Sequence, residues 1–232
     1  KKNMLLHINP NTNISQHHAA AIELNPNEIE LLKNHSHSVM FNAGDWIAKP
    51  HTPANHTAFI EEGLVKITLD SANGKSNILE ILGTGNFVGL MPLLSNDINL
   101  FTTVALTNTK VLLTQANTFR ELMQANHRFA NKIMSGICRQ NTSTIHRLVT
   151  INNKQLPGRV ADVILYFYEL NQQNLRFELP LSRSELAQFA GTTKESFIRT
   201  LAEFRNDKII DITDRQVCIN SLDIVKTLSR LG

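Results

Sequence analysis

Short apolar runs alternate with turn residues from about residue 38 to residue 113. Gly, Asn and Asp separate the runs, and Asn73-Gly74 stands between residues 64–69 and residues 78–82. An Asn-Gly pair in that position is a strong signal for a β-hairpin. Short strands at such regular spacing predict an antiparallel barrel or sandwich. The other apolar runs are residues 39–41, 58–60, 104–106 and 111–113.

Helical patterns lie on both sides of the predicted strands. Residues 26–34 predict a short helix before them, and residues 119–123 predict another after them. Asn117 or Thr118 is the expected N-cap of the second helix, since both side chains can accept a hydrogen bond from a free backbone N–H.

A longer helix is predicted from about His127 to Thr150, and it carries a coiled-coil pattern. Spacings of four and three residues between its seam positions are typical of a helix that packs along another helix. Two interpretations remain open: this helix lies on its own barrel, or two copies pair along it as a two-fold dimer. The seam residues are Met134, Ile137, Cys138, Asn141, Ile145 and Leu148.

The segment Asn152-Asn153-Lys154 interrupts the helical pattern and is interpreted as a hinge. Pro157-Gly158 then opens another helix, because Pro is favoured in a first helical turn. The predicted domains are therefore a barrel over residues 1–116, helices including the dimerisation helix over 117–152, and a C-terminal domain over 153–232.

The C-terminal domain contains two predicted short helices joined by a tight turn. Ser182 and Thr192 are good N-cap residues, and each has a Glu three positions later, Glu185 and Glu195. These pairs predict two capping boxes. Gly191 lies between them, where the first helix must end and turn. The pattern predicts a helix-turn-helix, which places its second helix in the major groove of DNA.

A β-ribbon is predicted after these helices. Residues 209–210 and 217–219 are apolar, and residues 211–216 form a polar link between them. A helix over 221–231 closes the chain. A helix-turn-helix followed by a ribbon predicts a winged helix.

The composition excludes some classes of protein but does not identify a function. Hydrophobic residues make up 42% and charged residues 19%, and no apolar run is long enough to span a membrane. The first twenty residues lack an apolar signal-peptide core, so a cytoplasmic protein is expected. The net charge is only +3, and residues 151–232 carry eleven Lys and Arg against ten Asp and Glu. Positive charge for nucleic acid must therefore be local.

The order of elements and motifs resembles the Crp–Fnr superfamily of bacterial transcription regulators, from about Phe41 to Val225. The most specific motif is residues 181–187, LSRSELA, followed by Lys194-Glu195-Ser196 and Arg199. Further matching motifs are Phe41-x-x-Gly44 and residues 59–66, 85–89, 119–122 and 158–161. The resemblance implies an α+β chain with an N-terminal antiparallel β jelly-roll barrel, a long dimerisation helix and a C-terminal winged helix-turn-helix domain.

The resemblance also implies a homodimer that reads an inverted repeat of double-stranded DNA, with RNA polymerase as a partner if the protein activates transcription. Glu195 and Arg199 match positions that read base edges. A Glu side chain can accept a hydrogen bond from cytosine, and an Arg side chain can donate hydrogen bonds to guanine. Ser182 and Arg183 match positions that hold phosphate. Thr193, Lys194 and Ser196 lie at the same helix tip. The alternative is that Glu195 and Arg199 form an ordinary surface pair at spacing i,i+4.

The barrel departs from the cyclic-nucleotide binders of that superfamily. They hold the ribose with a Glu after Gly and the phosphate with an Arg about ten residues later. Here Leu90 follows Gly89, and no Lys or Arg occurs from residue 76 to residue 109. A buried phosphate without a cation is costly, so cyclic AMP binding is not expected. No cysteines lie near the N-terminus, so an iron–sulfur cluster is not expected either.

Other effectors stay open. The nine histidines, with His17-His18 and His35, His37, His51 and His56 among them, leave a haem or metal sensor conceivable. Cys138 is a redox switch or, as expected here, a buried inert thiol. An apolar effector pocket is the further alternative to plain barrel core. Its candidate residues are Leu90, Met91, Leu93, Leu94, Phe101, Thr102 and Thr144.

Two other function classes are alternatives to a DNA-binding regulator. One is a haem- or small-ligand-binding sensor that acts through protein contacts. The other is a cupin-like barrel enzyme, which would need a His/Glu metal triad on barrel strands; no such spacing occurs, so the chain is not expected to be an enzyme.

Overall fold

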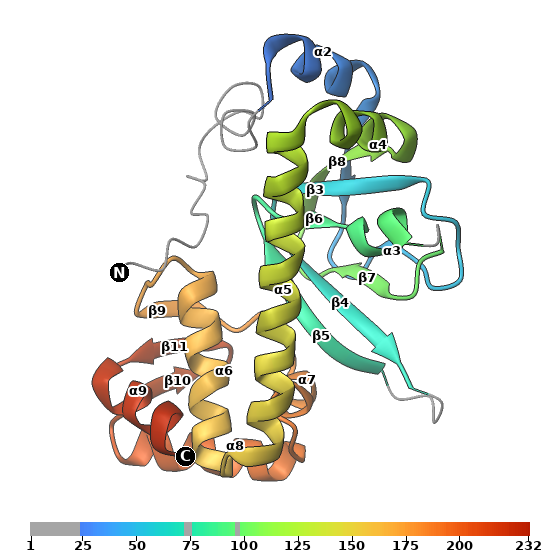
Figure 1. Ribbon diagram of the computed structural model, residues 1–232. Coiled ribbons are helices and arrows are strands. Elements are labelled where there is room, and N and C mark those ends of the chain that lie inside the picture. The colour runs from blue at the N-terminus through green and yellow to red at the C-terminus, as the bar shows by residue number, and fades with distance from the viewer. Residues whose placement is uncertain (1–23, 72–75, 96–97) are drawn as a thin grey trace. The chain divides into compact units, whose positions relative to one another are not determined.

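The computed structural model describes residues 24–71, 76–95 and 98–232, and the chain forms two compact units, residues 1–143 and residues 144–232 (Figure 1). The division falls inside helix α5 (His127–Asn153), so this one helix contributes residues to both units.

The first unit begins with helix α2 (Pro26–Asn34), as the sequence predicts, followed by two four-stranded sheets of antiparallel strands. One sheet has the order β1-β8-β3-β6 and the other the order β2-β7-β4-β5. This is the expected jelly-roll arrangement. The strands are β1 (Ser36–Phe41), β2 (Trp46–Ala48), β3 (His56–Glu62), β4 (Leu64–Asp70), β5 (Ser76–Gly83), β6 (Phe87–Val88), β7 (Thr102–Ala105) and β8 (Thr109–Gln115).

The β4–β5 hairpin predicted around Asn73-Gly74 is formed. Its strands pair antiparallel from Leu64 opposite Gly83 to Asp70 opposite Ser76. The turn itself lies outside the described residues. Two short elements were not predicted: strand β2, which has three residues, and helix α3 (Leu90–Ser95).

Apolar side chains fill the space between the two sheets. The buried cluster consists of Ala58, Ile60, Val65, Leu82, Val88 and Val111. A second cluster joins α3, α4 (Ala116–Ala125) and the start of α5, and three aromatic rings meet edge to face along it. Phe87, Phe119 and Phe129 have ring centroids 5.6 and 5.3 Å apart in turn. The first turns of α5 are therefore anchored in this unit.

Helix α4 has a different start from the one predicted. Its N-cap residue is Gln115, which makes no side-chain cap, so the expectation for Asn117 or Thr118 is wrong. Asn117 instead accepts a hydrogen bond from Arg120 Nη1 at 3.3 Å. The side chain of Asn126 does act as a cap, at the start of α5, where its Oδ1 accepts from the N–H of Phe129 at 3.0 Å.

The second unit contains α6 (Leu156–Leu170), β9 (Arg176–Glu178), α7 (Arg183–Phe189), α8 (Lys194–Asn206), β10 (Ile210–Thr213), β11 (Gln216–Ile219) and α9 (Leu222–Leu231). Its three strands form one sheet in the order β10-β11-β9. The sequence predicted the ribbon but not β9. Ser221 precedes α9 as its N-cap residue.

Two boundaries in this part of the chain differ from the prediction. Asn152 and Asn153 continue α5, and the helix ends only at Asn153. The Nζ of the following Lys154 lies 2.9 Å from a carboxylate oxygen of Asp162 on α6. The predicted polar link over 211–216 is mostly strand, because residues 211–213 pair with residues 216–218. Only Asp214 and Arg215 remain as the turn of the wing.

No helix within the described ranges is both long and apolar enough to cross a membrane.

Candidate nucleic-acid interface

Local sequence determines how α7 begins. Ser182 is its N-cap: the Ser182 Oγ accepts from the N–H of Glu185 at 3.3 Å, and a carboxylate oxygen of Glu185 accepts from the N–H of Ser182 at 2.9 Å. The first predicted capping box is therefore confirmed. The helix then ends at a tight turn in which Gly191 has a φ of +63°. A side chain there would be strained by the backbone and would overlap the side chain of Ile151.

The second predicted capping box is wrong. The N-cap of α8 is Thr193, not Thr192, and the Thr193 Oγ1 accepts from the N–H of Ser196 at 3.2 Å. Because the cap lies one residue later, Ser196 takes the third helical position and Glu195 the second. The Glu195 carboxylate is therefore not used as a cap, although its charge still suits a helix N-terminus.

The two faces of α8 differ sharply. Its inner face is buried, with Phe197 at 1% exposure and Leu201 and Phe204 at 4% each, as the sequence predicts. Lys194, Glu195 and Arg199 are exposed on the other side of the same turns. None of these three side chains has a hydrogen bond or ion pair to another residue that the structure describes, so the alternative Glu195–Arg199 surface pair is not formed.

Arg183 links the start of α7 to the wing. Its Nη2 donates to the backbone carbonyl of Asp214, at the turn between β10 and β11. Partial burial lowers the pKa of Arg183, the neighbouring Arg215 lowers it further, and Asp214 acts in the opposite direction. A guanidinium has five N–H donors, so this bond leaves others for a phosphate. The Ser182 hydroxyl is bound to Glu185 at 2.7 Å.

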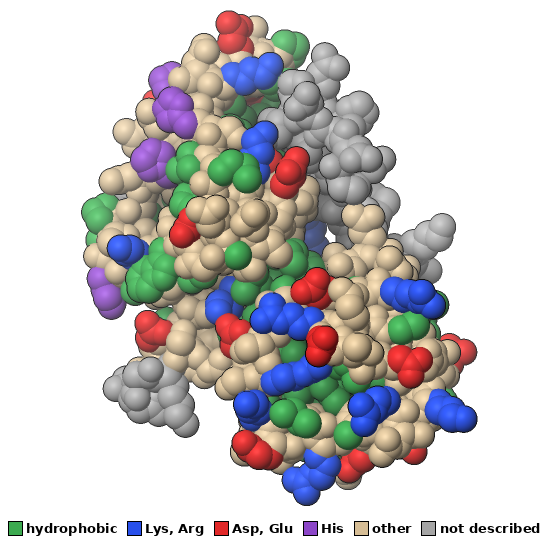
Figure 2. Space-filling view, turned by 180° about the vertical axis from the view of Figure 1, so that it is seen from behind, with side chains coloured by type: hydrophobic (Ala, Val, Ile, Leu, Met, Phe, Trp, Pro, Cys, Tyr) green, Lys and Arg blue, Asp and Glu red, His purple; other side chains and the backbone are tan. Residues whose placement is uncertain are grey.

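Sequence reasoning missed Arg215. This exposed cation stands at the turn of the wing, next to Asp214, whose φ is 51°. A sequence signal was present, because Arg215 is a cation within the polar link predicted over residues 211–216. The two-residue turn that exposes its side chain is seen only in the structure. Figure 2 shows Lys and Arg side chains on the face of the second unit, interspersed with acidic ones, which agrees with the small net charge.

The seam residues of α5 are mostly uncovered in the single chain. Met134, Ile145 and Leu148 are 48%, 60% and 50% exposed, and Asn141 is also exposed. The side chain of Ile137 is half-buried against the first unit's core, next to the buried Phe129 and Ile133. One face of α5 thus packs on the first unit, while the described residues leave another apolar stripe of the helix exposed. Cys138 is exposed, so the expected buried thiol is not found in the chain alone.

The candidate effector residues do not share one environment. Leu90, Leu93 and Thr102 are buried, whereas Met91 and Leu94 on α3 are 40% and 39% exposed and so do not belong to the barrel core. Phe101 is half-buried, and the half-buried Thr144 belongs to the second unit.

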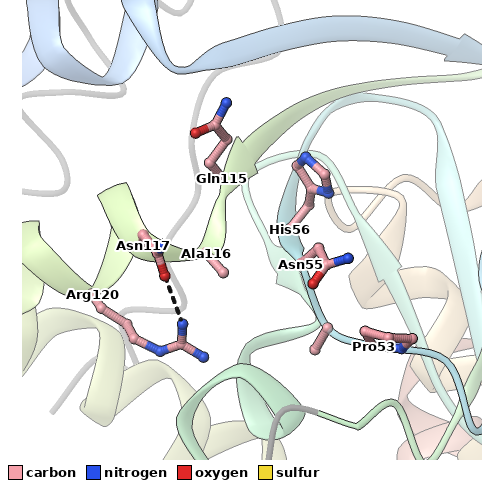
Figure 3. A pocket seen from close by; sticks show the side chains of 8 residues that line it. Pro53, Asn55, His56, Gln115, Ala116, Asn117 and Arg120 are labelled. Carbon is pink, nitrogen blue, oxygen red and sulfur yellow. Dashed lines mark hydrogen bonds between the residues drawn. The ribbon is translucent and has the colours of Figure 1, made fainter.

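An open pocket of the first unit is lined by other residues instead (Figure 3). The side chains of Asn117 and Arg120 from α4 lie on one side of it, and His56 from β3 lies on another. The remaining lining residues are Pro53, Ala54, Asn55, Gln115 and Ala116.

The histidines do not form a metal centre in the part of the chain that the structure covers. No group of three or more His, Cys, Asp or Glu side chains there is placed to hold a metal ion. His17 and His18 lie outside the described residues.

Comparison with known proteins divides the chain in the same way as its fold. Residues 38–126 match the family model of the cyclic nucleotide-binding domain, and residues 158–227 match that of the Crp-like helix-turn-helix domain. Together the two matches span most of the chain.

Similar proteins along nearly the full length are regulators of transcription. The chain is 22% identical over 199 residues to a CRP-like cAMP-activated global transcriptional regulator of Mycobacterium tuberculosis, covering 84% of this chain and 89% of that protein. It is 24% identical over 184 residues to a probable transcriptional regulator, flp, of Lacticaseibacillus casei, covering 79% and 83%. The solved structure of FixK2 from Bradyrhizobium japonicum shares the fold with a TM-score of 0.76 at 17% identity, covering 85% and 98%.

Proposed function

Because the chain belongs to the Crp–Fnr superfamily of DNA-binding transcription regulators and is not an enzyme, we propose that it reads an inverted repeat as a homodimer, through the start of α8. The proposed parts are an effector domain over residues 1–116, dimerisation helices over 117–152 and a DNA-binding domain over 153–232. Such a regulator acts in the cytoplasm, on the chromosome, and contacts RNA polymerase if it activates transcription.

The observation that carries this proposal is the contrast between the two faces of α8. The buried Phe197, Leu201 and Phe204 hold the helix against its own unit, so its exposed side is free to enter a groove. There Lys194, Glu195 and Arg199 have no partner among the described residues, and their donors and acceptors are available to a ligand. Arg199 suits guanine O6 and N7, Glu195 suits the cytosine amino group, and Lys194 suits a phosphate.

The residues around this tip have supporting roles. Thr193 caps the first turn of α8 by accepting from the N–H of Ser196, and the Thr193 hydroxyl also donates to the Ser196 hydroxyl at 3.1 Å. Ser182 and Arg183 lie at the start of α7, where free backbone N–H groups favour a phosphate. Arg215 adds a second cationic point at the wing. Phosphate contacts of this kind set the register, and the base contacts of α8 supply the sequence preference.

Selection of bound duplexes from a random pool tests the proposal. We expect an inverted repeat whose half-sites lie about one helical turn, roughly 34 Å, apart. Binding to that repeat, measured by gel shift, should weaken steeply as salt rises, because each phosphate contact releases counterions. Recovery of no shared sequence, together with a flat salt response, would instead support a sensor that acts through protein contacts.

The dimer is expected to depend on the exposed apolar stripe of α5. Leu148→Glu places two like charges opposite each other in the seam, so we expect monomers in sedimentation and a loss of at least about tenfold in affinity for the inverted repeat. His146→Glu is the matched control, because His146 is exposed on the same turns but outside the seam. An L148E protein that remains dimeric would contradict the proposed interface.

We propose that the effector domain does not bind cyclic AMP, in contrast to the Mycobacterium tuberculosis relative named for that ligand. Isothermal titration should show no saturable heat with cyclic AMP, because residues 76–109 contain no cation for its phosphate and the space between the sheets is filled by apolar side chains. The relative, titrated under the same conditions, is the positive control. Binding in the micromolar range would contradict this expectation.

A further inference from the structure

Two arginines from the helices that precede the helix-turn-helix hold its turn. Arg147, on the last turns of α5, donates from Nη1 to the carbonyl of Phe189 at 3.4 Å, and its guanidinium lies 4.3 Å from the centre of the Phe189 ring. Arg159, on α6, donates from Nη1 to the carbonyls of Ala190 and Gly191 at 3.1 and 2.5 Å. All these residues belong to the second unit.

The acceptors are groups that α7 cannot satisfy alone. Phe189 is the last residue of α7 and Ala190 its C-cap, so their carbonyls have no partner within the helix. Cations are also favoured at a helix C-terminus by the helix dipole. The two arginines thus bind the end of α7 where hydrogen-bond acceptors and negative partial charge coincide.

The fit around this end is close. The side chain of Ile151, one turn after Arg147 on α5, occupies the space that any side chain at position 191 would need. The rings of Tyr166 and Phe189 lie 5.0 Å apart in an edge-on contact. Buried Arg159 Nε has no hydrogen-bond partner among the described residues, and the Arg159 guanidinium is held through Nη1 by the carbonyls of Ala190 and Gly191, just after α7.

The same turns of α5 carry the exposed stripe. Ile145 and Leu148 are 60% and 50% exposed, whereas their neighbours Arg147 and Ile151 contact the turn between α7 and α8. A helix segment of fewer than ten residues therefore has the proposed dimer contacts on one side and the DNA-reading motif on the other.

From this arrangement we propose that Arg147 is a positioning residue that fixes the helix-turn-helix against the seam-bearing end of α5, while Arg159 holds the same turn from α6. Arg147 thereby sets the half-site spacing that the dimer accepts. The inference rests on the proposed homodimer. These contacts fix the orientation of each α8 relative to the dimer axis. If they are weakened, α8 can take several orientations, and one dimer can bind repeats of several spacings.

The test compares Arg147→Ala with the wild-type protein on four duplexes. They are the selected inverted repeat, the same repeat with one base pair added or removed between the half-sites, and a single half-site. The wild type should prefer its own spacing. We measure the preference as the ratio of the affinity for the selected repeat to the affinity for the repeats with altered spacing. We expect this ratio to fall about tenfold in R147A, which is the usual size of coupling between contacting residues, while the affinity for the single half-site stays unchanged.

Arg147→Lys and His146→Ala are the further variants. R147K keeps the charge but loses the planar donor set, so it should fall between the wild type and R147A. H146A changes an exposed neighbour and should keep the full spacing preference. Melting temperature is measured for each protein, and R147K serves for the comparison if R147A does not fold.

Three results would overturn the inference, and they separate it from the proposed function. A wild type without a spacing preference refutes the inverted-repeat dimer and, with it, the role of Arg147. If the wild type has a spacing preference and both R147A and R147K retain it, the positioning role of Arg147 is refuted, while the inverted-repeat dimer is not. A loss of single half-site affinity that parallels the loss on every repeat shows that Arg147 only stabilises the fold.

Discussion

Replacing Phe197 by Ala should lower the free energy of unfolding of the second unit by about 3–5 kcal/mol, the usual cost of removing a large buried aromatic side chain. Phe197 is 1% exposed and belongs to the largest fully buried side chains of the described residues. It also anchors the first turn of α8, directly beneath the exposed residues that are proposed to contact DNA. The substitution leaves a cavity that this turn can only partly fill.

The sequence offers a way to observe each unit separately. Trp46, the only Trp, lies in the first unit, and the only two Tyr, Tyr166 and Tyr168, lie on α6 in the second. Denaturation followed by near-ultraviolet circular dichroism should show the Tyr transition of F197A at lower denaturant, with the Trp46 fluorescence transition unchanged.

The control is the adjacent residue on the same helix. Ile198 is 43% exposed, so Ile198→Ala should change the unfolding free energy by no more than about 0.5 kcal/mol. Equal effects of F197A and I198A would mean that α8 does not pack against its unit as described.

Replacing Arg199 by Ala should weaken binding to the selected DNA site by about 1–3 kcal/mol and relax the sequence preference at one position of each half-site. The reason is that its planar fork of donors can bind guanine O6 and N7 together, which a shorter side chain cannot. Because Arg199 is exposed and has no partner among the described residues, the substitution should leave the melting temperature unchanged.

Binding to a set of single-base variants of the site measures both effects. Arg205→Ala is the matched control, because it removes the same charge from the exposed last turn of α8, far from the helix tip. R205A should keep the wild-type order of preference among the variants. If R199A keeps that order as well, Arg199 contacts phosphate or nothing, and the proposed base contact is wrong.

Much of the fold could be predicted because its signals are local. Alternating apolar runs, the Asn73-Gly74 pair and the Ser182–Glu185 capping box each depend on residues close together in the chain, and they identified the β-hairpin and the start of α7. One error fell where two neighbouring residues carry the same signal. Thr192 and Thr193 are both good caps, and the choice between them depends on where the chain leaves the turn at Gly191 and enters α8.

By itself, the sequence determined the order of the longer elements, the buried face of α8 and the exposed Lys194, Glu195 and Arg199, because helical periodicity separates inner from outer positions. The short β2, α3 and β9 carry too few residues for such a pattern. Only the tertiary structure decided which distant groups meet: Arg147 and Arg159 with the end of α7, and Arg183 with the turn of the wing. A long side chain carries no sign in the sequence of which carbonyl it will reach. That choice is made when separate helices pack and leave acceptors within range.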